Sequence, residues 1–198
     1  MEAKDSNFSP QDSFSLINRI IDEARYRYEE NGTIISLWGA AVIISGIGQF
    51  LLIMNGLAAK SGLIWLLMIP MFIYTIYRGF KDHKSRAKSP HTANDISSFV
   101  WFMAGMMAMS TGFIFSSKFG NAMVTVIYLP FCIAALVSAL TLKKTFFVWL
   151  SILAVFIAYG ALYIPYIYHP LISALIAGVL FLIPGLILRS DYNKRKHV

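Results

Sequence analysis

Residues 62–91 read GLIWLLMIPMFIYTIYRGFKDHKSRAKSPH. The stretch 62–77 is almost entirely apolar, whereas 78–91 is rich in Lys, Arg and His. An apolar block near the length of a membrane helix, followed at once by a short basic run, is typical of a span that ends on the cytoplasmic side of a membrane.

The rest of the chain repeats this pattern. Of its 198 residues, 57% are hydrophobic and only 14% are charged, whereas a soluble domain has about 25% charged residues. The apolar residues fall in blocks of about 20, the length of an α-helix that crosses the hydrocarbon core. Six spans are predicted, at 33–55, 62–78, 97–116, 121–142, 145–164 and 169–188.

The fold class predicted from these blocks is all-α: a six-helix transmembrane bundle of three antiparallel hairpins with an N-terminal amphipathic cytoplasmic helix. The turns on either side of the fourth span are only a few residues long, so neighbouring spans are expected to be antiparallel. Residues 1–32 form the N-terminal segment, 33–188 the bundle and 189–198 a basic tail.

The distribution of charge predicts the orientation of the bundle. With the N-terminus in the cytoplasm, six spans place all but two of the 17 lysines and arginines, Lys60 and Lys118, on the cytoplasmic side. Short cytoplasmic loops carry such an excess. We therefore expect a multi-pass protein of a bacterial cytoplasmic (inner) membrane with both termini in the cytoplasm. Nucleic acid is not an expected partner, because the basic run has no folded surface with base-reading residues.

Small residues predict where the spans approach one another, because lipid supplies no hydrophobic drive between helices. Span two has no such pairs four residues apart, and we expect it at the edge of the bundle. The other five spans carry them at Ala41 and Ser45; Ala104, Ala108 and Gly112; Ala135 and Ala139; Ala154 and Ala158; Ala174 and Gly178.

A tryptophan stands near the start of each odd-numbered span: Trp38, Trp101 and Trp149. Each even-numbered span carries an apolar-proline pair. This pattern fits three related hairpins, but it also fits the ordinary use of interfacial Trp and intramembrane Pro. The unequal Trp-to-Pro intervals favour the second interpretation.

Residues 9–30, SPQDSFSLINRIIDEARYRYEE, predict a helix before the first span. Phe14, Ile17, Ile21 and Tyr28 recur on it at helical spacing. The helix is more acidic than basic, unlike helices that lie on a membrane surface. These four residues are therefore expected to contact protein, either the cytoplasmic ends of their own bundle or a cytoplasmic partner.

The middle of each predicted span lacks ionisable side chains. No Asp, Glu, Lys, Arg or His lies in the middle of any of them, whereas ion-coupled transporters, proton relays and intramembrane hydrolases use such groups. We therefore expect no enzymatic activity, no catalytic residue, no metal site and no cofactor.

An uncharged polar set lies in the outer half of the bundle. Its members are Gln49, Asn55, Ser110, Thr111, Tyr159 and Tyr163. They could line a cavity for a neutral or lipid-like ligand, or they could form interhelical hydrogen bonds and an aromatic belt.

Two stretches carry a resemblance, YEENGTIISLWGAAVII at 28–44 and FLIPGLIL at 181–188. With them the chain resembles a group of small six-span bacterial membrane proteins that have a Leu-Trp-Gly step in the first span and Ile-Pro-Gly in the last. The resemblance implies the same fold and location, and it implies no activity.

Two functions follow from these observations. The first is a non-enzymatic interaction or sensing module with a cytoplasmic docking helix. The alternative is a facilitator or binder of a neutral or lipid-like small molecule through a cavity in the outer half. The expected partners are membrane lipid and a cytoplasmic protein at the N-terminal helix, and a homo-oligomer also fits the sequence.

Overall fold

The computed structural model describes residues 14–17, 32–85 and 92–196. Within them it is 93% helical and contains no strand. Six of its helical segments are long and apolar enough to cross a membrane: Thr33–Met54, Ala58–Gly79, Ser97–Ile114, Ser116–Thr141, Thr145–Tyr163 and Tyr166–Lys194. The six-helix, all-α class predicted from the sequence is confirmed, with span boundaries close to those expected.

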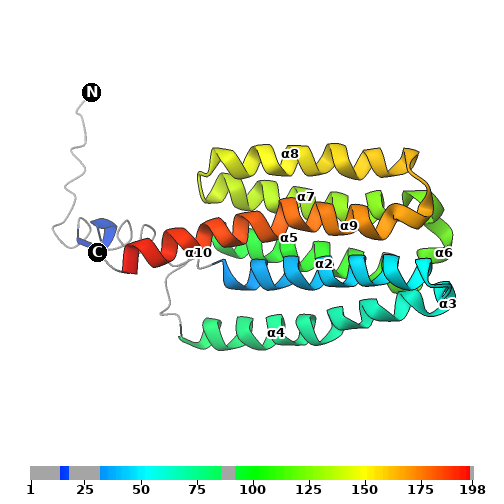
Figure 1. The fold of residues 1–198 in the computed structure, drawn as a ribbon. Helices are drawn as coiled ribbons and strands as arrows, with labels where there is room; N and C mark the ends of the chain where they lie inside the picture. Colours follow the sequence, from blue (N-terminus) through cyan, green and yellow to red (C-terminus); the bar gives the residue numbers. More distant parts are fainter. Residues whose placement is uncertain (1–13, 18–31, 86–91, 197–198) are drawn as a thin grey trace, which may run out of the picture.

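Several spans are built from more than one helix (Figure 1). In chain order the α-helices are α2 (Thr33–Met54), α3 (Ala58–Ser61), α4 (Met68–Ser85), α5 (Thr92–Met109), α6 (Ser116–Phe119), α7 (Met123–Thr141), α8 (Thr145–Gly160), α9 (His169–Ala177) and α10 (Ile183–Lys196). Short 3₁₀ segments lie at η1 (Gly62–Leu67), η3 (Gly120–Ala122), η4 (Ala161–Tyr163) and η5 (Tyr166–Tyr168). Two π-helical turns, η2 (Ser110–Ile114) and η6 (Gly178–Leu182), interrupt the third and sixth spans.

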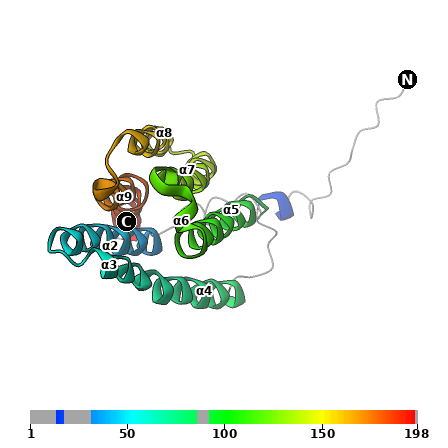
Figure 2. The ribbon, with the colours of Figure 1, turned by 90° about the vertical axis from the view of Figure 1, so that its right-hand side faces the viewer.

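The sixth span, formed by α9, η6 and α10, is the most buried of the six and lies between α2 and α8 (Figure 2). It contacts α2, α7 and α8, and 61% of its apolar window is buried, against 11% for the second span. The most extensive contacts join α2 to α9, α7 to α8, and α5 to α7. The first and last spans are thus direct neighbours, and the grouping into three separate hairpins remains an interpretation of the sequence.

Glycines bring the first and last spans into backbone contact. A Cβ added to Gly39 on α2 would lie 2.7 Å from the backbone nitrogen of Leu182. A Cβ added to Gly46, two turns further along α2, would overlap the carbonyl oxygen of Pro170. Such close approach is how helices associate where lipid offers no hydrophobic drive. We call this contact of α2 with α9, η6 and α10 the seam.

The seam continues at its other end through Gly185 on α10. A Cβ added to Gly185 would overlap the Ser36 hydroxyl. A Cβ added to Gly32, the residue before α2, would overlap the carbonyl oxygen of Gly185. Gly39 belongs to the Leu-Trp-Gly step and Gly185 to Ile-Pro-Gly, so the structure packs the two recognised motifs against one another.

The second span lies at the edge of the bundle, as the sequence predicts. Apart from its own segments, its main contacts are with α2 (Figure 2). The beginning of α2, the end of α4, the α7–α8 turn and α10 lie together at one end of the bundle (Figure 1). We call this end the basic end, for the lysines and arginines described below.

Candidate functional site

Gln49 makes an interhelical hydrogen bond. Its Oε1 accepts a hydrogen bond of 2.6 Å from the indole Nε1 of Trp65, which lies on η1 of the second span. A deep amide in a membrane protein requires such a partner. The residue at the centre of the predicted cavity thus holds the edge span onto α2.

Two other members of the outer polar set bond within their own helices. The Nδ2 of Asn55 donates to the carbonyl of Leu51 at 2.8 Å, and the hydroxyl of Ser110 donates to the carbonyl of Met106 at 2.8 Å. Thr111 is buried in η2, one residue after Ser110.

The two tyrosines of the set point outward. Tyr159 is 49% exposed on α8, and Tyr163 is 91% exposed on η4. The six residues therefore lie on three different spans, in bonds within the bundle or on its surface. That arrangement matches the second interpretation from the sequence, interhelical bonds and an aromatic belt, more closely than a shared cavity.

A cavity of about 30 Å³ lies elsewhere, toward the basic end. It is mostly apolar and offers two hydroxyls, Ser138 and Ser151. A space of this size holds a water molecule or two and is far below the volume of a drug-sized ligand site. Its other lining residues are Ile35, Trp101, Ala135, Ala139, Leu142, Phe147, Leu150, Val179, Leu180, Pro184 and Leu188.

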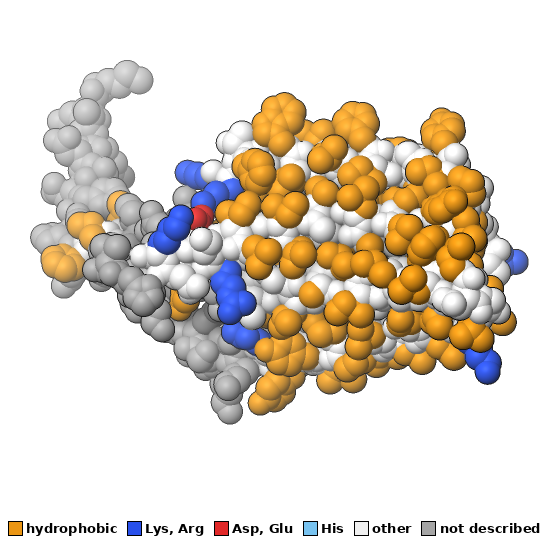
Figure 3. Space-filling model, viewed as in Figure 1, with side chains coloured by type: hydrophobic (Ala, Val, Ile, Leu, Met, Phe, Trp, Pro, Cys, Tyr) orange, Lys and Arg blue, Asp and Glu red, His pale blue; other side chains and the backbone are white. Residues whose placement is uncertain are grey.

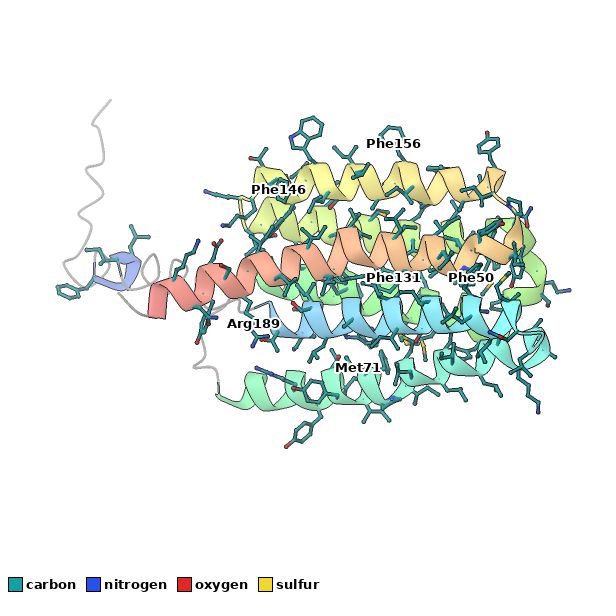
Figure 4. All side chains as sticks on the ribbon, in the orientation of Figure 1. Phe50, Met71, Phe131, Phe146, Phe156 and Arg189 are labelled. Carbon is teal, nitrogen blue, oxygen red and sulfur yellow. The ribbon has the colours of Figure 1, made fainter. Side chains whose placement is uncertain are left out.

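Ser138 on α7 is a hydrogen-bonding node beside this cavity. It accepts the indole N–H of Trp101 at 2.7 Å and shares a hydrogen bond of 2.9 Å with Ser97, both from the third span. The Trp101 ring packs on Phe131 and Phe181 with centroids 6.0 and 5.6 Å apart, and Figure 4 shows Phe131 inside the bundle. The π-helical turn η6 carries Phe181 into this cluster.

A second hydrogen bond from an indole N–H to a hydroxyl joins the first span to the second. The indole N–H of Trp38 donates to the hydroxyl of Thr75 at 2.9 Å, and this pair is 37 residues apart, as are Trp101 and Ser138. Trp149, the third tryptophan of the sequence pattern, is 65% exposed and faces away from the bundle. A Trp-hydroxyl bond that the sequence did not predict therefore joins the first span to the second and the third span to the fourth.

His169 closes the outer turn between the fifth and sixth spans. It is 3% exposed, and its Nε2 lies 3.1 Å from the carbonyl oxygens of both Ala161 and Ile164. With its N–H at Nε2, His169 donates to these carbonyls at the bend of the chain, where the carbonyl of Ala161 also accepts the backbone N–H of Ile164 at 3.2 Å. His169 Nδ1 and the hydroxyl of Ser45 are buried without a hydrogen-bond partner in the described part of the chain.

The described residues bring no metal site together. Among 14–17, 32–85 and 92–196, no three His, Cys, Asp or Glu side chains are grouped as ligands. Cys132 is a buried free thiol in the core.

At the basic end, the α7–α8 turn is tied to α10. The ammonium group of Lys144 lies 2.7 Å from a carboxylate oxygen of Asp191. Lys143 beside it adopts the left-handed backbone conformation, with φ of 54°, which permits the tight reversal between the two helices. Figure 3 shows lysine and arginine side chains grouped at this end, around one acidic group.

The predicted docking residues are described only in part. Residues 14–17 form a short helical piece near the basic end, in which Phe14 is 71% and Ile17 is 51% exposed. Ile21 and Tyr28 lie outside the described residues.

The chain was compared with models of protein families, with curated proteins and with solved structures, and none of the three comparisons gave a match.

Proposed function

We propose that this integral membrane protein is a non-enzymatic interaction module that presents its N-terminal segment to a cytoplasmic protein. The observation that carries the proposal is the exposure of Phe14, Leu16 and Ile17. Three apolar side chains on one short helical piece are left uncovered by the bundle. Grouped exposed apolar side chains are typical of interaction sites.

The interior of the bundle supports the same function. The deep amide of Gln49 is bonded to Trp65, and the cavity beside Ser138 has room for water only. A facilitator of a neutral ligand would use the outer polar set as a lining, and those side chains are engaged in bonds or turned outward. The bundle then acts as a scaffold that fixes the position of the N-terminal segment.

The location that we propose is a bacterial cytoplasmic membrane, with the basic end in the cytoplasm. The excess of lysine and arginine at that end supports this orientation. Cysteines that replace Lys60 and Lys118 at the opposite end should react with an impermeant thiol reagent added outside intact cells. Reaction only after the cells are opened would reverse the orientation.

Site-specific photo-crosslinking tests the docking surface. A photoreactive residue at Ile17 in intact cells should give a discrete adduct with one other protein, and Phe14→Ser should abolish that adduct. A photoreactive residue at Leu63, which is 61% exposed on the second span at the opposite end, is the matched control and should not form it. Adducts from Ile17 only to the chain itself would support packing on its own bundle and contradict the proposal.

A further inference from the structure

The two ends of the bundle differ in charge among the side chains that the structure describes. The opposite end has Lys60 and Lys118, and Figure 3 shows the larger group of cations at the basic end. Asp191 is the one acidic residue whose side chain is described. The described cations of the basic end are Arg78, Lys143, Lys144, Arg189 and Lys194.

Asp191 is used within the protein. Its carboxylate pairs with the ammonium group of Lys144 at 2.7 Å. Lys143 and Arg189 are exposed, and no acidic side chain in the described part of the chain is paired with either. These two residues therefore carry positive charge outward with no counterion from the described protein.

Lys143 stands where the apolar surface of the fourth and fifth spans ends. Phe146 and Trp149 follow it on α8, and they are 55% and 65% exposed. At a rise of 1.5 Å per residue, Trp149 lies about 6 Å deeper along α8 than its first residue, Thr145, and Lys143 lies in the turn before that residue. An exposed tryptophan marks the membrane–water interface, so the ammonium group of Lys143 lies at the level of the lipid phosphates.

Arg189 has the same setting on α10. Ile183 and Leu186, which lie one to two turns before Arg189, are exposed apolar residues on the outside of the bundle. Arg189 is the first exposed charged residue after Leu186. Figure 4 shows Arg189 at the basic end of α10. A guanidinium binds phosphate through two parallel hydrogen bonds, and its apolar stem can remain along the bundle.

We propose that Lys143 and Arg189 bind the phosphate groups of anionic phospholipids in the leaflet that faces the basic end. Lys143 lies in the turn between α7 and α8, and Arg189 lies on α10. Anionic lipid then supplies the counter-charge that the described protein does not, and it also holds the bundle at a fixed depth. This binding is independent of any protein partner at the N-terminal segment.

Electron spin resonance with spin-labelled lipids tests the proposal on the full chain. The protein is reconstituted in phosphatidylcholine vesicles, and the motionally restricted fraction is measured for labelled phosphatidylglycerol and for labelled phosphatidylcholine. The unmodified protein should restrict phosphatidylglycerol more. The double variant Lys143→Gln, Arg189→Gln should lose most of that preference, and the matched double variant Lys60→Gln, Lys118→Gln should keep it.

Three results would overturn the proposal: an undiminished preference in the Lys143, Arg189 variant, an equal loss in the control variant, or no preference in the unmodified protein. Both variants change exposed residues, so equal unfolding temperatures in phosphatidylcholine show that the fold is intact. Sodium phosphate should lower the preference only as much as sodium chloride of the same ionic strength. A larger effect of phosphate would assign the site to free phosphate and contradict lipid binding.

Discussion

The first span contacts the last span through glycines and contacts the second span through indole hydrogen bonds. Along the seam, Gly39 and Gly46 let backbone meet backbone, with Leu182 and Pro170 in direct contact. Along the second span, Trp38 and Trp65 each donate to a side chain across the interface. The contact with the last span depends on the close approach of backbone atoms. The contact with the second span places hydrogen-bonded polar groups between the helices.

The difference explains the position of each span. Gly39 and Gly46 let the backbone of α2 reach the backbone of the sixth span, which packs these two spans closely together. The second span is joined to α2 by side-chain hydrogen bonds, which do not require the two backbones to touch. Only 11% of its apolar window is buried, in keeping with a position at the edge. Gln49 and Trp65 form one of the hydrogen bonds of this contact.

Gly39→Ala should have the largest effect on stability. The added methyl group meets the backbone nitrogen of Leu182 at 2.7 Å, and backbone cannot move aside as a side chain does. We expect a loss of about 3 kcal/mol, the upper end of the range for overpacking. Reversible unfolding in mixed detergent micelles measures it.

Gly105→Ala is the matched control for this prediction. A Cβ there meets nothing within 4 Å, so the change should be neutral or should stabilise α5 by about 0.5–1 kcal/mol. Equal losses for the two variants would mean that the seam is not in backbone contact.

Replacement of Trp101 by Phe should have the next largest effect. It removes the hydrogen bond to Ser138 and part of the packing on Phe131 and Phe181. We expect a loss on the order of 2 kcal/mol. Trp149→Phe, the same change at a side chain that faces away from the bundle, should cost much less, and the same unfolding assay compares them. If Trp149→Phe cost as much, the assignment of Trp101 to the core would be wrong.

Gln49 and Trp65 should show a smaller, shared contribution. In a double-mutant cycle of Gln49→Leu and Trp65→Phe, we expect a coupling energy of about 0.6 kcal/mol, and at most about 1.7, as for other hydrogen bonds within membranes. The unfolding free energies of the two single variants and the double variant give this value. A coupling of zero would leave Gln49 available for a ligand and would revive the facilitator hypothesis.

The ion pair of Lys144 and Asp191 should contribute least. Its side chains are 43% and 31% exposed, and exposed pairs contribute about 0.2–1 kcal/mol. Lys144→Gln should therefore cost less than about 1 kcal/mol, and the cost should shrink as salt is added. Lys143→Gln removes the same charge from a residue that has no acidic partner among the described side chains, and it is the control. A salt-independent cost would argue against an ion pair.

The sequence predicted the parts of the fold that depend on hydropathy. The lengths of the apolar blocks identified six spans, and the absence of small residues in the second span placed it at the edge. The sequence did not predict that the first span packs on the last. A small residue shows that a helix can approach closely, but its partner is decided by how all six spans fill space. Gly32, Gly39 and Gly46 stand seven residues apart, which was the available signal.

The candidate site was harder to predict. Interhelical hydrogen bonds were one of two interpretations of the outer polar set, and Gln49 makes such a bond with the indole N–H of Trp65. The role of Ser138 was missed, since a serine within an apolar span usually bonds its own helix. The 37-residue spacing of Trp38 and Thr75, repeated at Trp101 and Ser138, could have revealed it.

The central claim is that the first and last spans are neighbours, and one measurement tests it most directly. Phe50 on α2 and Tyr168 before α9 are stacked with ring centroids 6.1 Å apart. In a Cys132→Ala background, cysteines at these two positions should be joined within one chain by the shortest bifunctional thiol reagents. Replacing Tyr163 instead, which is 91% exposed on the same outer turn, should greatly reduce the crosslink. Efficient crosslinking from Tyr163 and none from Tyr168, or crosslinks only between chains, would contradict the seam.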